Sequence, residues 1–142
     1  METNNREMVT VQTTVGLPVE KVWELWGLPE HITKWNSASD DWHTPRAEND
    51  LRTGGKFTAR MEAKDGSFGF DFGGVYDEVI DHQLIRYTMG DGRKVEVRFA
   101  EKNGATSVVE RFDPEQTNPV DMQRTGWQSI LDNFKKYAEQ NQ

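Results

Sequence analysis

Hydrophobic and polar positions alternate near the start of the chain. In residues 8–15 many side chains are β-branched, and Val9, Val11 and Val15 share one parity. Alternation with a period of two is typical of a strand that buries one face. The pattern therefore predicts a first strand that ends at Gly16.

After this strand, apolar side chains recur every three or four residues, which is the period of an amphipathic helix. Pro18 suits the first turn of such a helix, and Gly27 suits its end. The apolar positions are Val19, Val22, Trp23 and Trp26. We expect two short helices in this part of the chain, the second over residues 29–35.

From residue 40 to residue 114 the period returns to two, and turn signals such as Asp65-Gly66 and Asn103-Gly104 interrupt the pattern. Turns at regular intervals between alternating segments predict consecutive antiparallel hairpins. The predicted strands cover residues 40–48, 56–63, 67–80, 84–89, 93–101 and 105–113. The large rings on one parity are Phe57, Phe68, Phe70, Phe72, Tyr76, Tyr87, Phe99 and Phe112. The side chains on the opposite parity are mostly polar. One face of the sheet is therefore expected to be aromatic and the other exposed to solvent.

The last segment is long enough to cover the aromatic face. Asn118 suits an N-cap and Pro119 a first helical position, and an apolar stripe runs on to Ala138. The predicted fold is α+β, with a curved antiparallel sheet around a long C-terminal helix and two short helices after the first strand. We expect a single domain over residues 1–142, with its core at about 8–138.

Composition narrows the class of protein. The chain has no cysteine, and its 17 basic against 24 acidic residues give a net charge of −7. The absence of thiols excludes disulfides and thiolate metal sites, and the acidic balance disfavours nucleic acid as a partner. No apolar run could span a bilayer, and residues 1–7 offer no hydrophobic stretch for a secretion signal. A cytoplasmic location is expected.

Four segments are similar to those of a known family. They read PVEKVWELW at 18–26, PEHITKW at 29–35, DLRTGGKF at 50–57 and GWQSILDNF at 126–134. In this order they resemble the bacterial homologues of the ninety-kilodalton heat-shock protein ATPase activator, a family of the START-like (SRPBCC, Bet v-like) helix-grip superfamily. The resemblance runs from about residue 8 to 137. It implies a largely apolar cavity between sheet and helix, which the superfamily uses for hydrophobic ligands.

Some of the rings are therefore candidates for contact with a ligand. In a helix-grip fold, side chains near the ends of the long helix pack solidly, whereas those near its middle face the cavity. The expected ligand-binding residues are Trp35, Phe70, Phe72, Tyr76, Tyr87, Phe99, Trp127 and Leu131. The hydroxyl groups of Tyr76 and Tyr87 would orient the ligand. The alternative is that all of these rings fill the core.

Glu110 shares parity with Val108 and Phe112, so the pattern points it at the aromatic face. An unpaired charge there is costly. Glu110 could be a ligand-orienting acid or a general base with a raised pKa. The structural alternatives are a slip in strand parity, or an ion pair with Arg86 or Arg124. These alternatives are favoured over a catalytic role for Glu110.

Two further features have structural interpretations. The three histidines, His31, His43 and His82, fall on a predicted helix, strand and turn, without the spacing of a metal site, so neither a metal nor a cofactor is expected. Gly73 and Gly74 lie in the longest strand, where glycine usually marks a bend or bulge. Room beneath a ligand is the functional alternative.

Three functions remain open. The first is a module that binds a small hydrophobic or aromatic molecule without chemistry, because the aromatic face has no catalytic constellation. The second is an enzyme of the cyclase or hydratase type, with Glu110 or a cavity tyrosine as acid or base. The third, implied by the resemblance alone, is an interaction domain that activates a chaperone's ATPase.

Overall fold

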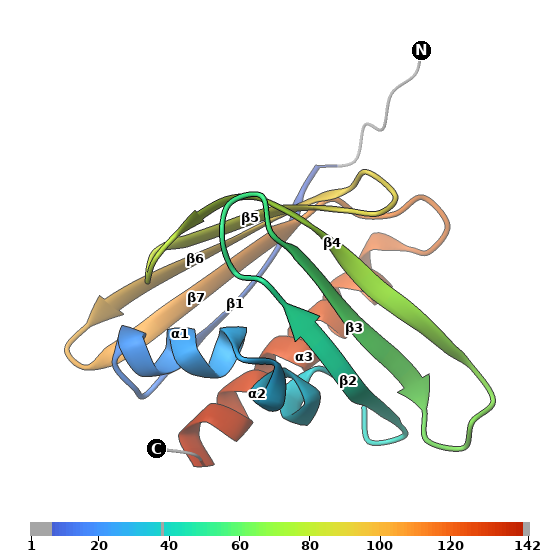
Figure 1. The fold of residues 1–142 in the computed structure, drawn as a ribbon, viewed down its shortest axis with the longest axis horizontal. Helices are drawn as coiled ribbons and strands as arrows, with labels where there is room; N and C mark the ends of the chain where they lie inside the picture. The colour runs from blue at the N-terminus through green and yellow to red at the C-terminus, as the bar shows by residue number, and fades with distance from the viewer. Residues whose placement is uncertain (1–6, 38, 141–142) are drawn as a thin grey trace.

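The computed structural model describes residues 7–37 and 39–140, and in this part of the chain seven strands form one antiparallel sheet (Figure 1). Its order is β1-β7-β6-β5-β4-β3-β2. The strands are β1 (Val9–Val15), β2 (Trp42–Asn49), β3 (Lys56–Ala63), β4 (Gly69–Ile80), β5 (Leu84–Met89), β6 (Lys94–Lys102) and β7 (Ala105–Phe112). Neighbours from β2 to β7 follow one another in the chain, as the hairpin pattern predicted. β1 joins the far edge by pairing with β7.

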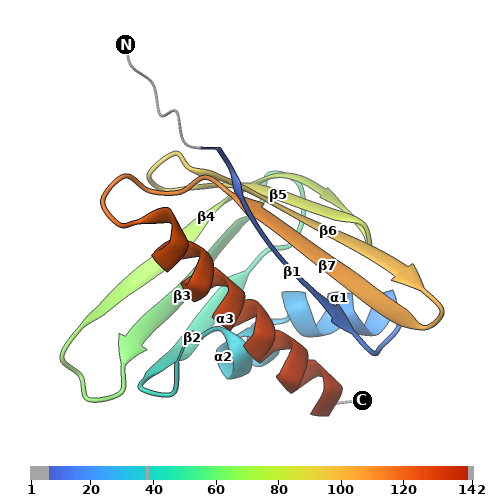
Figure 2. The ribbon, with the colours of Figure 1, turned by 180° about the vertical axis from the view of Figure 1, so that it is seen from behind.

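Three helices lie on the inner side of this curved sheet. They are α1 (Val19–Gly27), α2 (Pro29–Trp35) and α3 (Val120–Gln140). Figure 2 shows α3 running across the open side of the sheet, with α1 and α2 near its C-terminal end. The predicted α+β fold, with a curved sheet around a long C-terminal helix and two short helices after the first strand, is confirmed.

One end of the interior, next to α1 and α2, is packed with aromatic rings. Phe134 of α3 is fully buried, and its ring centroid lies 5.0 Å from that of Trp26 and 4.9 Å from that of Trp35. The Trp35 indole Nε1 donates a hydrogen bond to the Leu25 carbonyl oxygen, so the polar atom of this ring is satisfied. This end of the interior is solid.

Phe99 lies in this solid part. Its ring is 5.1 Å from Trp23 and 5.7 Å from Trp26, both edge-on, because α1 packs against β6 here. Phe99 is 5% exposed and belongs to the core. Phe99, which was expected to contact a ligand, therefore packs between the sheet and α1 and does not line the cavity described below.

The sheet bends most sharply in β4, where glycines allow neighbouring backbones to approach. A Cβ atom on Gly73 would lie 2.5 Å from the Phe57 carbonyl oxygen, and one on Gly74 would lie 2.3 Å from that of Thr88. The register also shifts between Tyr76 and Glu78. These contacts support the structural interpretation of both glycines.

Two strands begin later than expected. Strand β4 starts at Gly69 instead of residue 67, because a turn through Asp65 and Gly66 closes the hairpin, with Ser67 N–H donating to the Asp65 carboxylate. Phe68 is consequently 61% exposed, outside the inner face on which its parity had placed it. Strand β2 starts at Trp42 instead of residue 40. Residues 1–6, on which the expectation about a secretion signal rests, lie outside the described residues.

Candidate functional site

A cavity of about 340 Å³ lies between the middle of α3 and the strands from β2 to β7. This is within the range of roughly 300–1,000 Å³ that is typical of small-molecule pockets. Seven of the eight expected ligand-binding residues line it, and Phe99 does not. The seven are Trp35, Phe70, Phe72, Tyr76, Tyr87, Trp127 and Leu131.

Several rings around the cavity contact one another. Phe57 lies 4.8 Å from Tyr87, edge-on, and 5.0 Å from Tyr76. Trp127 stacks on Phe112 at 4.0 Å with an interplanar angle of 10°. Phe112 covers one face of Trp127, so the opposite face is the one available to a ligand. Ring contacts of this kind fix the walls in place.

The walls are not closed. Phe57, Phe72 and Trp127 remain partly exposed although they face inward. Of the residues at the edge, Phe70 is 42% exposed, and Asn118, just before α3, is also exposed. These positions mark a mouth between β4 and the start of α3.

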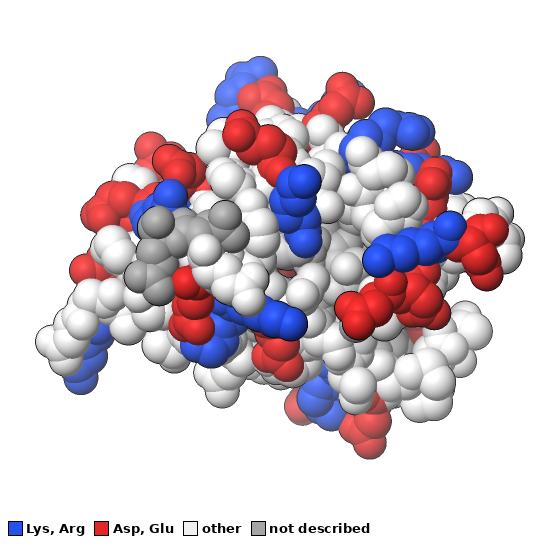
Figure 3. Space-filling model, turned by 90° about the horizontal axis from the view of Figure 1, so that it is seen from below, with Lys and Arg blue, Asp and Glu red and all other residues white. Residues whose placement is uncertain are grey.

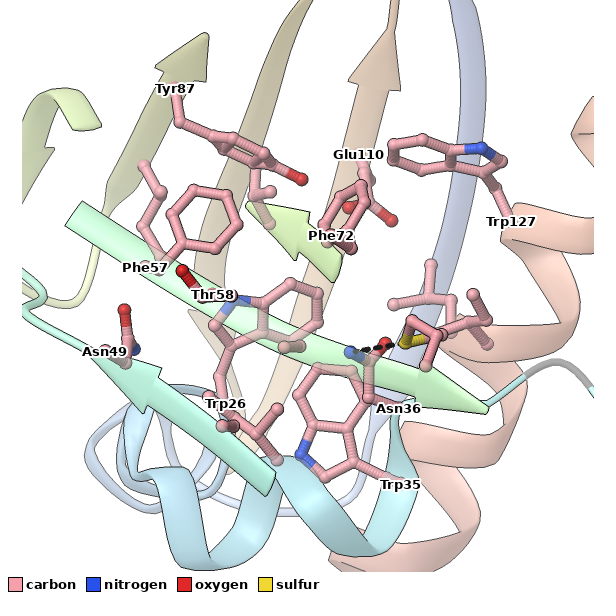
Figure 4. Close-up of a pocket in the computed structure, with 18 of the residues that line it drawn as sticks. Trp26, Trp35, Asn36, Asn49, Phe57, Thr58, Phe72, Tyr87, Glu110 and Trp127 are labelled. Carbon is pink, nitrogen blue, oxygen red and sulfur yellow. Dashed lines mark hydrogen bonds between the residues drawn. The ribbon is translucent and has the colours of Figure 1, made fainter. Parts of the chain in front are cut away.

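Glu110 of β7 lies among these rings. It pairs with Val11 of β1 and Val97 of β6, both buried, so its side chain points to the inner face as its parity predicted. Figure 4 shows its carboxyl group beside Phe72 and Trp127, with the Tyr87 hydroxyl group pointing into the same space. Glu110 is 7% exposed and lines the cavity.

The Glu110 carboxyl group has no hydrogen-bond or ion-pair partner among residues 7–37 and 39–140. Burial raises its pKa to about 8, since removal from water disfavours the charged form. The carboxyl group is thus mostly protonated at neutral pH, and its oxygens are free to meet a group inside the cavity.

The two structural interpretations of Glu110, a slip in strand parity and an ion pair with Arg86 or Arg124, are wrong. The parity does not slip, and both proposed partners are engaged elsewhere. Arg86 pairs with Glu78 and Glu96 on the outer face of the sheet, and Arg124 pairs with Asp121 on α3. Removal of these candidates leaves the ligand-orienting and acid–base roles of Glu110 as the predictions that still stand.

The two tyrosines expected to orient a ligand differ. Tyr76 donates its hydroxyl proton to Asn49 Oδ1, and Asn49 Nδ2 donates to the Gly27 carbonyl oxygen at 2.6 Å, so this hydroxyl ties β4 to β2 and α1. The Tyr87 hydroxyl group has no hydrogen-bond partner in the described part of the chain. Burial, and next the charge of Glu110, raises the pKa of Tyr87 well above its ordinary value. Tyr87 is therefore the tyrosine whose hydroxyl group is available to a ligand.

Sequence reasoning missed several lining residues. The rings among them, Trp26 and Phe57, were recognised as inward but assigned to the core. Of the polar ones, Asn36, Asn49 and Arg93 stand where helix or strand gives way to a loop. Periodicity carries no signal at such positions, because a loop sets the direction of its side chains by its own backbone path.

Other kinds of site find little support in the described residues 7–37 and 39–140. No three His, Asp or Glu side chains there are grouped as metal ligands would be, and none of their helices is both long and apolar enough to cross a membrane. On the face shown in Figure 3, basic and acidic side chains are interspersed. This arrangement differs from the clustered basic surface that binds nucleic acid.

A curved antiparallel sheet that holds a long C-terminal helix across an aromatic cavity defines the α+β helix-grip class of proteins. Within this class, the chain belongs to the family described as activator of Hsp90 ATPase homolog 1-like protein, whose model matches residues 16–139. The resemblance noted in the sequence is thereby confirmed. No curated protein matches the chain.

Solved structures agree with this assignment. The chain is 43% identical to an AHSA1-like protein from Aeromonas hydrophila, with a TM-score of 0.89 over 95% of this chain and 94% of the other. It is 55% identical to a protein from Cytophaga hutchinsonii, with a TM-score of 0.82 over 94% and 93% of the two chains. A protein from Chromobacterium violaceum, 20% identical, shares the fold with a TM-score of 0.83 over 94% and 99%.

Proposed function

We propose that this protein binds a small, mainly apolar molecule in the cavity between its sheet and α3. The observation that carries the proposal is the cavity itself, which has about 340 Å³ of space walled by rings that remain partly exposed. Burial of apolar ligand surface against such rings supplies affinity, and a few polar groups supply orientation. Glu110 and Tyr87 are buried polar residues of the lining whose side chains have no hydrogen-bond or ion-pair partner among the described residues.

The test is binding of a neutral apolar probe, with the cavity filled in a variant. Ala47 lines the cavity, whereas Ala100 of β6 is exposed on another part of the sheet. In Ala47→Phe the added ring occupies ligand space, so the affinity for the fluorescent probe phenylnaphthylamine should fall by about tenfold or more. Ala100→Phe adds the same ring elsewhere and should bind like the wild type.

Native mass spectrometry of the purified protein gives an independent measurement. A compound retained by the wild type and by Ala100→Phe, but not by Ala47→Phe, would support the proposal and reveal the natural ligand. Equal probe affinity in all three proteins, together with no retained compound, would refute it.

An acid–base enzyme is the second candidate, and the buried Glu110 beside Tyr87 favours it. A carboxyl group with a pKa of about 8 can exchange a proton with a bound substrate near neutral pH. In this case the retained compound would be converted during incubation, and Glu110→Gln or Tyr87→Phe would stop the conversion. A compound recovered unchanged would favour binding alone.

The third candidate, activation of a chaperone, rests on the family's description as homologues of an Hsp90 ATPase activator. It predicts that the purified protein stimulates the ATPase of an Hsp90-type chaperone. Because this role needs a surface and not the cavity, Ala47→Phe should stimulate as well as the wild type. If the protein does not stimulate the ATPase and no chaperone co-purifies with it, chaperone activation is excluded.

A further inference from the structure

We infer that the molecule bound in this cavity carries an organic cation, such as a protonated amine, which pairs with Glu110 among the aromatic rings. The inference rests on the proposed function and names the chemical class of its ligand. It follows from three features of the cavity: a carboxyl group without a partner, ring faces around it, and an excess of acidic side chains in the lining.

The first feature is the position of Glu110. Its backbone is held between β1 and β6 by pairing with Val11 and Val97, so the side chain cannot turn to solvent without a change in register. A buried carboxyl group normally has a cation or several donors beside it. Here the described residues supply neither. The missing partner is therefore best supplied by a ligand.

The second feature is the set of rings beside this carboxyl group. Trp127 and Phe72 lie next to it in Figure 4, and their ring centroids are 6.5 Å apart in an edge-to-face arrangement. Aromatic faces attract cations and repel anions, because the ring face carries negative charge density. Phe112 covers one face of Trp127, and the other face is available to a cation paired with Glu110.

The third feature is the charge of the lining. Among the described residues, three carboxyl side chains line the cavity, those of Glu48, Glu110 and Glu115, against one guanidinium group, that of Arg93. The Arg93 guanidinium pairs with Asp91 at 2.8 Å, which offsets its charge. An anionic ligand would meet more acidic than basic side chains in the lining of a protein with a net charge of −7, whereas a cation would pair with Glu110 once this carboxyl group is deprotonated.

The titratable and charged groups that line the cavity with Glu110 can be named for each element. They are Tyr87 of β5, Tyr76 of β4, Glu48 of β2, Arg93 between β5 and β6, and Glu115 before α3. Burial alone accounts for the raised pKa of Glu110, so none of these groups offsets the loss of water. A bound cation would favour the carboxylate, and binding would release a proton below about pH 8. Affinity for the cation should therefore increase with pH and level off near this value.

Two probes of nearly equal size test the inference. Phenethylamine keeps its positive charge up to about pH 9, whereas phenethyl alcohol is neutral. Binding of each is measured by NMR titration, with the Trp127 indole signal as reporter, from about pH 6 to about pH 9. In the wild type the amine should bind about tenfold tighter than the alcohol at the upper end of this range, and its affinity should increase with pH.

Variants identify the group responsible. Glu110→Gln keeps the size of the side chain and removes its charge, so the preference for the amine and its pH dependence should both disappear while the alcohol binds as before. Glu20→Gln makes the same change at an exposed position of α1 outside the cavity lining and is the matched control, in which the preference should persist. The same NMR spectra report whether each variant is folded.

The outcomes separate this inference from the proposed function. Equal affinity for the two probes in the wild type, or a preference for the amine that survives in Glu110→Gln, would overturn the cationic ligand and leave the apolar cavity in place. Binding of neither probe by the wild type would contradict both proposals.

Discussion

Glu110 has a valine opposite it on each neighbouring strand, and this setting determines its chemistry. Val11 and Val97 supply no donor, so the carboxyl group depends on protonation or on a ligand for its stability. The raised pKa of Glu110 also makes the stability of the fold depend on pH, because in the unfolded chain the same group has a pKa near its ordinary value of 4.5. Between that value and about 8 the native state binds a proton that the unfolded state does not, so stability decreases as the pH rises.

Glu110→Gln should remove this loss of stability. Below about pH 4.5 the variant and the wild type should have similar free energies of unfolding, since both side chains are then uncharged. The variant should become the more stable of the two as the pH rises, by on the order of 4 kcal/mol near pH 8. Urea unfolding at several pH values measures the difference. A variant that is less stable throughout would mean that the buried carboxyl group has a partner in the native state.

The strands of the sheet could be predicted where apolar and polar residues alternate strictly along the chain. The strands from β2 to β7 alternate and are separated by turns, most of which contain glycine, so their order and the inner parity of Phe57 and Glu110 could be read from the sequence. The register shift after Tyr76 could not, because it depends on the partner strand. Phe99 has the same inward parity as the cavity residues, and only the position of α1 shows that it is covered.

Two glycines test how closely the elements pack, because packing requires glycine at one of the two positions and not at the other. In Gly74→Ala the new Cβ would lie 2.3 Å from a backbone oxygen of β5, so the two strands must separate. Gly126 lies inside α3, where a Cβ meets no atom within 4 Å. Gly74→Ala should destabilise the fold by about 2 kcal/mol or more, and Gly126→Ala should stabilise it by about 1 kcal/mol. Thermal unfolding of both variants measures the contrast, and a loss of stability in Gly126→Ala would contradict it.

The molecule as a whole is held together by a small number of elements distant in sequence. α3 packs on β1, and the side chain of Asn133 in α3 donates to the Trp35 carbonyl oxygen at the end of α2. The cavity lies between these contacts, so a ligand inside it touches both the sheet and α3. Occupancy should therefore stabilise the whole fold and not one part of it.

Ligand binding should be visible as a change in melting temperature. A ligand at about one hundred times its dissociation constant adds about 2.7 kcal/mol to the stability of the native state, which corresponds to several degrees for a chain of this size. Differential scanning calorimetry of the wild type with phenylnaphthylamine should show this increase, whereas in Ala47→Phe, which binds the probe about tenfold more weakly or worse, the increase should be about half as large or less. An equal increase in both proteins would place the probe outside the cavity.

The covering of the aromatic face by α3 also has a consequence for synthesis. The ribosome completes the seven strands of the described sheet before it makes the 21 residues of α3. Until α3 has emerged, Phe72, Tyr87 and Phe112 face a hollow that no helix closes on that side. The nascent chain therefore exposes this apolar surface until α3 has been made, and ribosome-associated chaperones can reach it during that time. Slow release of α3 would lengthen this exposure and favour aggregation.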